Sequence, residues 1–190
     1  LGVLDDTYDW PTVVDVVKDL NEMGVRKAII NPRTPKLNYN GIYNYTPRGD
    51  IEVMRKACEL TESLGYVFMP FDEYCLVFDD APGWKGTGIT VKDQNGQPVR
   101  SAVFSPGTRG YFACTTTILD RARSKLADTE RICSSYSGRF VDALVGLPLR
   151  ECHDPEHTIT RTEDWQARVE VLEYMHKKGL VIYTEGGQSW

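Results

Sequence analysis

Several features that would assign this chain to a specialised class are missing from its 190 residues. No apolar run approaches the ~20 residues that a membrane-spanning helix requires, so we expect no membrane span. Neither a GxGxxG nor a Walker sequence is present, which argues against a nucleotide-binding doubly wound sheet. The formal net charge is −5 rather than positive, which argues against a nucleic-acid-binding surface. The remaining composition, 41% hydrophobic and 26% charged, is typical of a globular domain.

Cysteine pairs at metal-binding or redox spacing are also missing. The five cysteines are Cys58, Cys75, Cys114, Cys133 and Cys152. Their odd number and scattered positions argue against a disulfide framework or a zinc knuckle, so we expect buried, reduced thiols. Reduced thiols favour a cytoplasmic location, and a secreted parent protein stays open. The chain lacks an initiator Met and stops after an apolar run, so we expect a piece of a longer polypeptide.

What the sequence does contain is a recurring unit: a helix, a glycine, a short apolar strand and a polar loop. Hydrophobic periodicity predicts helices over 9–24, 51–64, about 115–136 and 163–178. It predicts strands over 25–31, 66–72, 139–145 and 180–185. Strands that alternate with helices imply a parallel sheet. The fold class is therefore α/β.

A (β/α)8 barrel of the TIM type contains eight such units in about 250 residues. About four units are legible here, so we expect one incomplete barrel domain over residues 1–190. Residues 87–104 break the rhythm, because Asn95-Gly96 separates two alternating runs and predicts a β-hairpin insertion. The rest of the barrel, or accessory domains, would lie elsewhere in a longer chain.

Polar side chains appear where the predicted strands end, at Asn31, Asp72, Asp142 and Glu185. The carboxyl ends of parallel strands are where such folds hold their sites. Asp142 and Glu185 follow consecutive strands, and neighbouring strands lie about 4.8 Å apart. Two inward carboxylates can then approach the ~5.5 Å spacing of retaining glycosidases, with Asp142 as nucleophile and Glu185 as general acid/base. The alternative for Asp142 is a structural ion pair with an arginine such as Arg139 or Arg161.

The loop after the strand that carries Asp142 is rich in groups that bind polar ligands. It contains Glu151, His153, His157 and Arg161, which are candidates for hydrogen bonds to sugar hydroxyls. His153 and His157 are also candidate metal ligands, although Pro155 between them argues against the helix that would give their spacing meaning. We therefore expect no metal or other cofactor.

Carboxylates combined with aromatic rings are typical of sugar sites, since acids accept from hydroxyls and rings stack on apolar sugar faces. Asp72 and Tyr74 provide this combination after the second predicted strand. Trp190, which follows Glu185, is a candidate for either substrate contact or packing.

Five segments of the chain together resemble a known family. They read PFDEYCLVFDDAP, VKDQNGQPV, RFVDAL, RECHDPEHTITRTEDWQAR and VIYTEGGQSW. Their order and spacing resemble the barrel of endo-α-N-acetylgalactosaminidase-like glycoside hydrolases, a layout shared by large bacterial glycosidase-like proteins. The resemblance covers most of the chain from about residue 25 and is strongest over 66–84 and 139–190.

The resemblance implies a retaining mechanism on an α-linked sugar. It implies a nucleophile on the fourth barrel strand, matching Asp142, and an acid/base at the end of the fifth, matching Glu185. It also implies that Asp72 and Tyr74 line the sugar subsite. The chain departs from the family at Phe71, where relatives often have His, and at Gly186-Gly187, where relatives have an aromatic residue. These departures concern the identity of the sugar.

The expected activity is therefore hydrolysis of an α-linked glycan or glycoconjugate by two carboxylates. Two alternatives stay open at this point. One is a metal-dependent barrel hydrolase that uses His153 and His157. The other is a barrel that binds carbohydrate without cleaving it.

Overall fold

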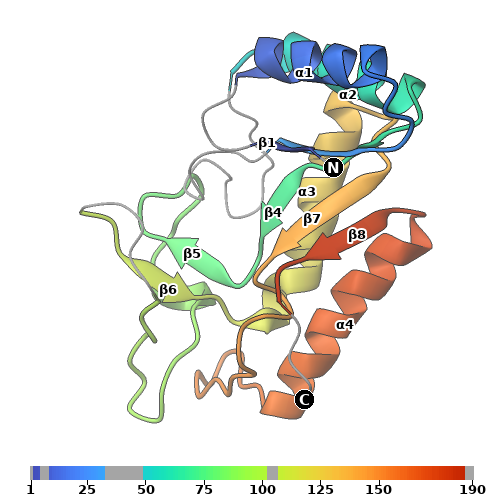
Figure 1. Cartoon of the computed structure of the whole chain (residues 1–190). Helices are drawn as coiled ribbons and strands as arrows, with labels where there is room; N and C mark the ends of the chain where they lie inside the picture. Colours follow the sequence, from blue (N-terminus) through green and yellow to red (C-terminus); the bar gives the residue numbers. More distant parts are fainter. Residues whose placement is uncertain (1, 5–8, 33–48, 102–106, 187–190) are drawn as a thin grey trace.

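The computed structural model describes residues 2–4, 9–32, 49–101 and 107–186. In these ranges the chain is a mixed α/β fold with a parallel sheet (Figure 1). The sheet strands are β1 (Gly2–Leu4), β2 (Ile29–Pro32), β3 (Val67–Phe68), β4 (Phe71–Glu73), β7 (Gly138–Asp142) and β8 (Val181–Thr184). Hydrogen bonds connect them in the orders β1-β2-β3 and β4-β7-β8, and all these pairings are parallel.

The two ladders are joined through β3 and β4, which follow each other along the chain with only Met69 and Pro70 between them. Met69 donates its N–H to the Ile30 carbonyl on β2, and Phe140 on β7 donates to the Pro70 carbonyl. Proline has no N–H to continue a ladder, which explains the break at this point. Counted along the sheet, with β3 and β4 as one strand, β7 is the fourth strand and β8 is the fifth.

The predicted helices are present as α1 (Trp10–Glu22), α2 (Ile51–Ser63), α3 (Ile118–Ile132) and α4 (Arg161–Lys177). Asp9 caps α1 by accepting from the Thr12 N–H at 3.0 Å, and Asp50 caps α2 by accepting from the Glu52 N–H at 2.8 Å. Thr160 and Glu163 form a reciprocal capping box at the start of α4.

One face of the sheet packs against these helices. A single core cluster contains residues from all four helices and from the sheet, including Val17, Ile30, Met54, Phe68, Ala122, Leu126, Val141 and Met175. The opposite face carries a second buried cluster, which contains Met69, Phe71 and Phe140. The sheet is thus apolar on both faces, as predicted for parallel strands.

Gly138 has a packing reason to be glycine. A Cβ at this position would lie 2.6 Å from Val67 Cγ1 on β3 and 2.9 Å from Met69 Cε, just after β3.

The expectation that a helix runs to about residue 136 is wrong, because α3 ends at Ile132 and Gly138 is the first residue of β7.

A long excursion between β4 and α3 forms a small structure of its own. β5 (Leu76–Phe78) pairs antiparallel with β6 (Gly110–Phe112), in a segment where the sequence suggested only a polar loop. The predicted hairpin lies beside it, with its tight turn at Asp93–Gln97 and a hydrogen bond from the Val99 N–H to the Val91 carbonyl. The antiparallel bridge between Lys92 and Pro98 confirms the pairing.

The described strands do not close into a barrel. β8 is an edge strand, and its residues Val181 and Tyr183 are 47% and 55% exposed. The observed part is therefore an open, parallel α/β arrangement. No helix in the described part is both long and apolar enough to cross a membrane.

Two of the cysteines form a disulfide, which corrects the expectation of reduced thiols. Cys58 on α2 and Cys133, the residue after α3, are bonded, with their Cα atoms 6.4 Å apart. The packing of α2 beside α3 creates this proximity, and a separation of 75 residues hides it in the sequence. Cys75, Cys114 and Cys152 are buried and free of disulfides.

Replacing both Cys58 and Cys133 by Ala should lower the free energy of unfolding by about 4 kcal/mol, because the disulfide closes a long loop in the unfolded chain. Denaturant unfolding of the variant and of the oxidised wild-type protein measures this difference. The wild-type protein treated with reductant is the control and should match the variant within about 1 kcal/mol. A count of five free thiols in the untreated native protein would contradict the assignment.

Candidate active site

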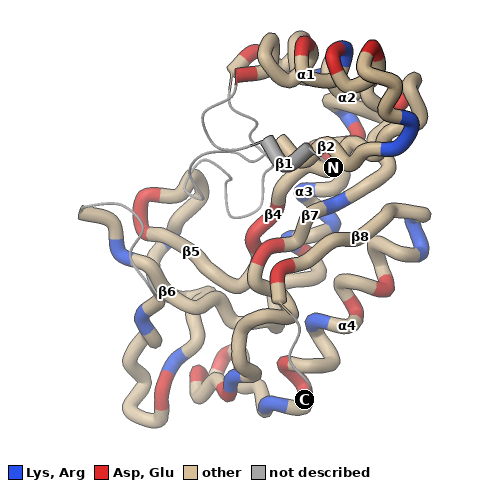
Figure 2. The backbone as a smooth tube through the Cα atoms, in the orientation of Figure 1, with Lys and Arg blue, Asp and Glu red and all other residues tan. Residues whose placement is uncertain are grey.

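Three carboxylates lie at the ends of three adjacent parallel strands. Glu73 ends β4 and is paired in register with Asp142, which ends β7. Val141 is paired with Thr184 on β8, so Glu185 follows in line with Asp142. Figure 2 shows the acidic positions at the ends of β4, β7 and β8 side by side. We call Glu73, Asp142 and Glu185 the carboxylate layer.

A layer of aromatic side chains lies next to the carboxylate layer. It shows on which face of the sheet the carboxylates lie. The Phe71 and Phe140 rings stack with centroids 5.4 Å apart, and the Phe140 and Tyr183 rings stack at 5.2 Å. These three residues come two positions before the three carboxylates, so strand alternation places both layers on the same face. This is the face opposite α1 to α4.

Asp142 and Glu73 are buried, with 7% and 4% of their surfaces exposed, whereas Glu185 is exposed. Burial, followed by the neighbouring charge of Asp142, raises the pKa of Glu73 to about 8. Two backbone N–H groups, from Cys75 at 2.5 Å and Leu76 at 2.9 Å, oppose this shift because they donate to Glu73 Oε1. At neutral pH the Glu73 carboxyl is therefore mostly protonated.

The loop after Asp142 is held in an unusual conformation. Ala143 has a positive φ of 57°, a rare backbone state for a residue with a side chain, and such residues concentrate at functional sites. Arg168 on α4 stabilises this loop by donating to the carbonyls of Leu144 at 2.9 Å, Leu147 at 2.7 Å and Pro148 at 3.1 Å. Asp164 accepts from Arg168 at 2.8 Å and holds its guanidinium in place.

The same loop touches the backbone that carries Glu185. A Cβ added to Gly146 would lie 2.9 Å from the Glu185 carbonyl oxygen. Only a glycine allows this close approach, so the loop after β7 positions the chain after β8. This contact at Gly146 joins the segment that follows Asp142 to the segment that carries Glu185.

Asp72 and Tyr74, whose sugar-binding role stays a prediction, lie in a buried network on the helix side of the sheet. Asp72 is 0% exposed and accepts from Arg139 Nε at 2.5 Å and from the Tyr74 hydroxyl at 2.5 Å. Lys125 Nζ on α3 lies 3.8 Å from the Asp72 carboxylate and 5.1 Å from the Tyr74 ring centroid. Burial lowers the pKa of Lys125 to about 8. Strand alternation explains the placement, because Asp72 points to the helices when Glu73 points away from them.

Three other residues predicted to bind substrate lie together in and after the loop between β7 and α4. Glu151 Oε2 lies 4.0 Å from His153 Nε2, and Glu151 Oε1 lies 3.6 Å from Arg161 Nε. These side chains line an open groove of about 250 Å³ between the hairpin and the loop that leads to α4. The groove is also lined by the polar residues Arg150, Asp93 and Gln94 and by the apolar residues Val91, Val99 and Leu149, so its wall is mixed.

The structure separates the remaining predicted residues from one another. His157 does not line the groove with His153; it lies beside Cys152 and Asp154. Asn31 is 6% exposed on β2, with no hydrogen-bond partner for its buried side-chain oxygen among the described residues. Trp190 lies outside the described residues. Glu73 was not among the predicted site residues, although it lies at the end of the second predicted strand beside Asp72.

Comparison with solved structures shows that this fold occurs in α-glycosidases. The chain is similar to the ligand-free α-N-acetylgalactosaminidase NagBb from Bifidobacterium bifidum, with a TM-score of 0.83 at 19% identity over 97% of this chain. It is also similar to the cycloalternan-forming enzyme from Listeria monocytogenes in complex with a pentasaccharide substrate, with a TM-score of 0.63 at 10% identity over 100% of this chain. A third match is TtGalA, the α-galactosidase from Thermus thermophilus, with a TM-score of 0.59 at 14% identity over 94% of this chain.

These matches cover only part of each neighbour, namely 34%, 21% and 35% of their chains in the same order. The chain thus spans about a third of NagBb. No protein-family model matches the sequence, and no curated protein matches it. At these identities the comparisons establish the fold, which is that of a fragment of α-glycosidase structures.

The raised pKa of Glu73 predicts a pH-dependent stability. Below pH 4.5 the carboxyl is protonated in both states; between about 4.5 and 8 only the unfolded chain loses the proton, so stability falls as pH rises through this window. Glu73→Gln should remove this contribution, which is at most about 1.4 kcal/mol per pH unit for one proton. Unfolding free energies of both proteins from pH 4.5 to 8 give the difference, with Glu59→Gln on exposed α2 surface as the control. Parallel curves for wild type and Glu73→Gln would contradict the assignment.

Proposed function

We propose that this chain supplies the acid-bearing part of the catalytic barrel of a retaining α-glycoside hydrolase. Asp142 is the nucleophile and Glu185 is the general acid/base. The observation that carries the proposal is the carboxylate layer, since it brings three acids to one face at adjacent strand ends. The similarity in fold to several α-glycosidases supports it.

Residue placement supports a division of labour between the two acids. Asp142 and Glu185 extend from neighbouring strands, which lie about 4.8 Å apart, and retaining enzymes need carboxyl groups about 5–5.5 Å apart. Asp142 is buried, as suits a group that bonds to the sugar in a site without bulk water. Glu185 is exposed, as suits a group that must deliver a proton and then meet a water molecule.

In the proposed reaction an Asp142 oxygen attacks the anomeric carbon while Glu185 donates its proton to the glycosidic oxygen, which leaves with the bonding electron pair. A glycosyl ester on Asp142 results. Glu185, now ionised, removes a proton from water, and the water oxygen displaces Asp142 from the anomeric carbon. Two inversions give net retention, and both acids return to their initial states.

Glu73 has a positioning and hydrogen-bonding role in this scheme. Because it is neutral at neutral pH, its carboxyl can donate a hydrogen bond to the Asp142 carboxylate or to a sugar hydroxyl without adding a second charge. We assign Asn31 to the same face as a further polar contact. The rim groove formed by Glu151, His153 and Arg161 would bind a more distant part of an extended glycan.

The open edge of the sheet supports the proposal that further strands complete the barrel. β8 leaves Val181 and Tyr183 exposed, and eight strands are needed for closure whereas five positions are filled here. We propose that the remaining strands come from another part of the full-length protein.

A screen of aryl α-glycosides with the full-length protein tests the proposal, and we include α-galactosides and α-N-acetylgalactosaminides. Asp142→Asn should lower kcat/KM at least about 10³-fold, because the amide is a poor nucleophile. Asp15→Asn, on the exposed surface of α1, is the matched control and should leave activity unchanged. NMR of the first-formed product should show the α-anomer. Activity of Asp142→Asn within tenfold of wild type, or a β-anomeric product, would rule out the proposed mechanism.

Gly146→Ala tests whether the loop after β7 positions Glu185. Because the new Cβ would lie 2.9 Å from the Glu185 carbonyl, that backbone must move, and a displacement near 1 Å can cost about 100-fold in rate. We expect kcat to fall at least about tenfold in steady-state assays, with unfolding still cooperative. Gly88→Ala is the control, since a Cβ there meets no atom within 4 Å. Equal rates for the two variants would show that this contact does not position the acid.

A further inference from the structure

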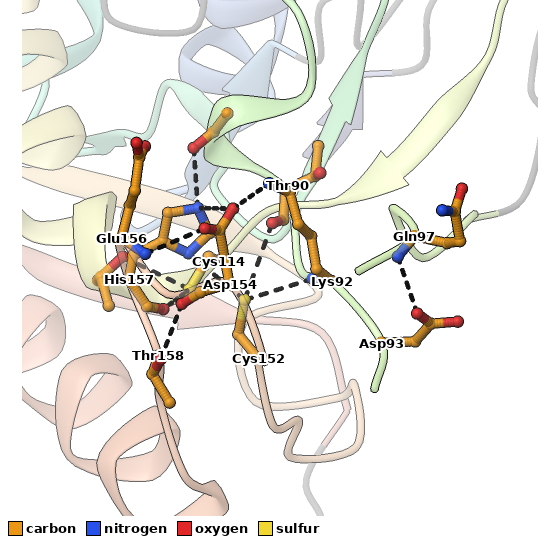
Figure 3. A network of polar contacts seen from close by, with 12 residues as sticks. Thr90, Lys92, Asp93, Gln97, Cys114, Cys152, Asp154, Glu156, His157 and Thr158 are labelled. Carbon is orange, nitrogen blue, oxygen red and sulfur yellow. Dashed lines mark hydrogen bonds and ion pairs between the residues drawn. The ribbon is translucent and has the colours of Figure 1, made fainter. Parts of the chain in front are cut away.

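Two free cysteines and a histidine from separate segments converge next to Thr90 and Lys92, where the hairpin begins (Figure 3). Cys114 follows β6, while Cys152 and His157 belong to the loop between β7 and α4. Their possible ligand atoms all lie within 4.8 Å of one another, and Cys152 Sγ is 3.4 Å from His157 Nδ1. Among the described residues, no other group of three or more His, Cys, Asp or Glu side chains converges in this way.

From this convergence we propose that Cys114, Cys152 and His157 bind a Zn²⁺ ion, with a water molecule as fourth ligand. We call them the Cys2His cluster. Two thiolates balance the charge of the ion, so the loaded site is neutral, which suits the complete burial of both cysteines. Sulfur and imidazole ligands are those that zinc prefers. The proposal is independent of the glycosidase assignment.

The histidine is held in the form that can bind a metal. His157 Nε2 lies 2.8 Å from the Gly88 carbonyl, which can only accept, so Nε2 carries the proton. Nδ1 then keeps its lone pair and faces the sulfur atoms. The Asp154 carboxylate lies 3.1 Å from the same Nε2 and is itself ion-paired with Lys92. A carboxylate behind a histidine is a recurring arrangement around zinc.

Each sulfur atom also receives a hydrogen bond from outside the Cys2His cluster. The Lys92 N–H points to Cys152 Sγ at 3.3 Å, and the Thr116 hydroxyl points to Cys114 Sγ at 3.4 Å. Donors directed at sulfur stabilise the thiolate, the form that binds metals. Without an ion, each thiol also donates to a carbonyl oxygen, Cys114 to that of His157 at 3.5 Å and Cys152 to that of Thr90 at 3.9 Å.

The local backbone brings the ligands of the second segment together. Cys152 and Ile159 form an antiparallel bridge that closes a short loop. Asp154 shapes this loop by accepting from the Glu156 N–H with its side chain at 3.1 Å and from the His157 N–H with its carbonyl at 3.1 Å. The His157 side chain is 11% exposed, so the Cys2His cluster reaches solvent at this residue. A bound ion would fasten the excursion after β4 to the loop after β7.

The test uses the full-length protein, purified, kept reduced and stripped of metal with a chelator. We expect one equivalent of Zn²⁺ to bind and, at 100-fold excess over Kd, to raise Tm by about 5 °C or more. Substitution with Co²⁺ should give sulfur-to-cobalt absorption of the intensity expected for two thiolates. These wild-type readouts stand even if a variant fails to fold.

Cys152→Ser and His157→Gln should each weaken metal binding by about 100-fold or more, and Asp154→Asn by about 10–100-fold. Cys75→Ser is the matched control, because Cys75 is also a buried thiol but lies outside the Cys2His cluster. Absence of Zn²⁺ and Co²⁺ binding by the reduced wild-type protein would overturn the proposal. Unchanged metal binding in Cys152→Ser would also overturn the proposal, as would loss of metal binding in Cys75→Ser but in neither Cys152→Ser nor His157→Gln. A Cys114–Cys152 disulfide in the native protein would overturn it as well.

Discussion

The buried ion pair between Asp72 and Arg139 connects the two strands on which the candidate site depends. Asp72 lies on β4 and Arg139 on β7, and their side chains meet on the helix side of the sheet at 2.5 Å. A one-residue slip of β4 against β7 would turn Asp72 to the opposite face and leave the arginine buried without its acid. Because the pair fixes this register, Glu73 lies opposite Asp142 on the other face. A structural carboxylate behind the sheet thereby sets the position of two carboxylates in front of it.

The same alternation explains which parts of the site the sequence predicted. Periodicity located the helices and parallel strands, and the Asn95-Gly96 pair located the hairpin, because each depends on residues close together in the chain. It also placed Asp142 and Glu185 at consecutive strand ends. It did not distinguish Asp72 from Glu73, because two adjacent acids at a strand end point to opposite faces and only the exact register decides which one faces the helices.

Features that join distant segments were outside the reach of sequence patterns. The disulfide between Cys58 and Cys133, the pairing of β5 with β6, and the approach of Cys114 to Cys152 all depend on tertiary packing. His157 was predicted as a ligand-binding residue together with His153, but the bridge at Cys152 and Ile159 turns it towards the sulfur atoms. The loops around the candidate site are braced by Arg168 and by the contact at Gly146. Precise loops are what the proposed role of Glu185 as a catalytic acid requires.

The most direct measurement of the central claim is the identification of the residue that bonds to the sugar. The full-length protein would be incubated with a slow 5-fluoroglycosyl fluoride of the sugar it hydrolyses, digested, and sequenced by mass spectrometry. A retaining mechanism with the proposed roles predicts a glycosyl ester on Asp142 and on no other residue. A label on Glu73 or Glu185, or turnover without any covalent intermediate, would contradict it.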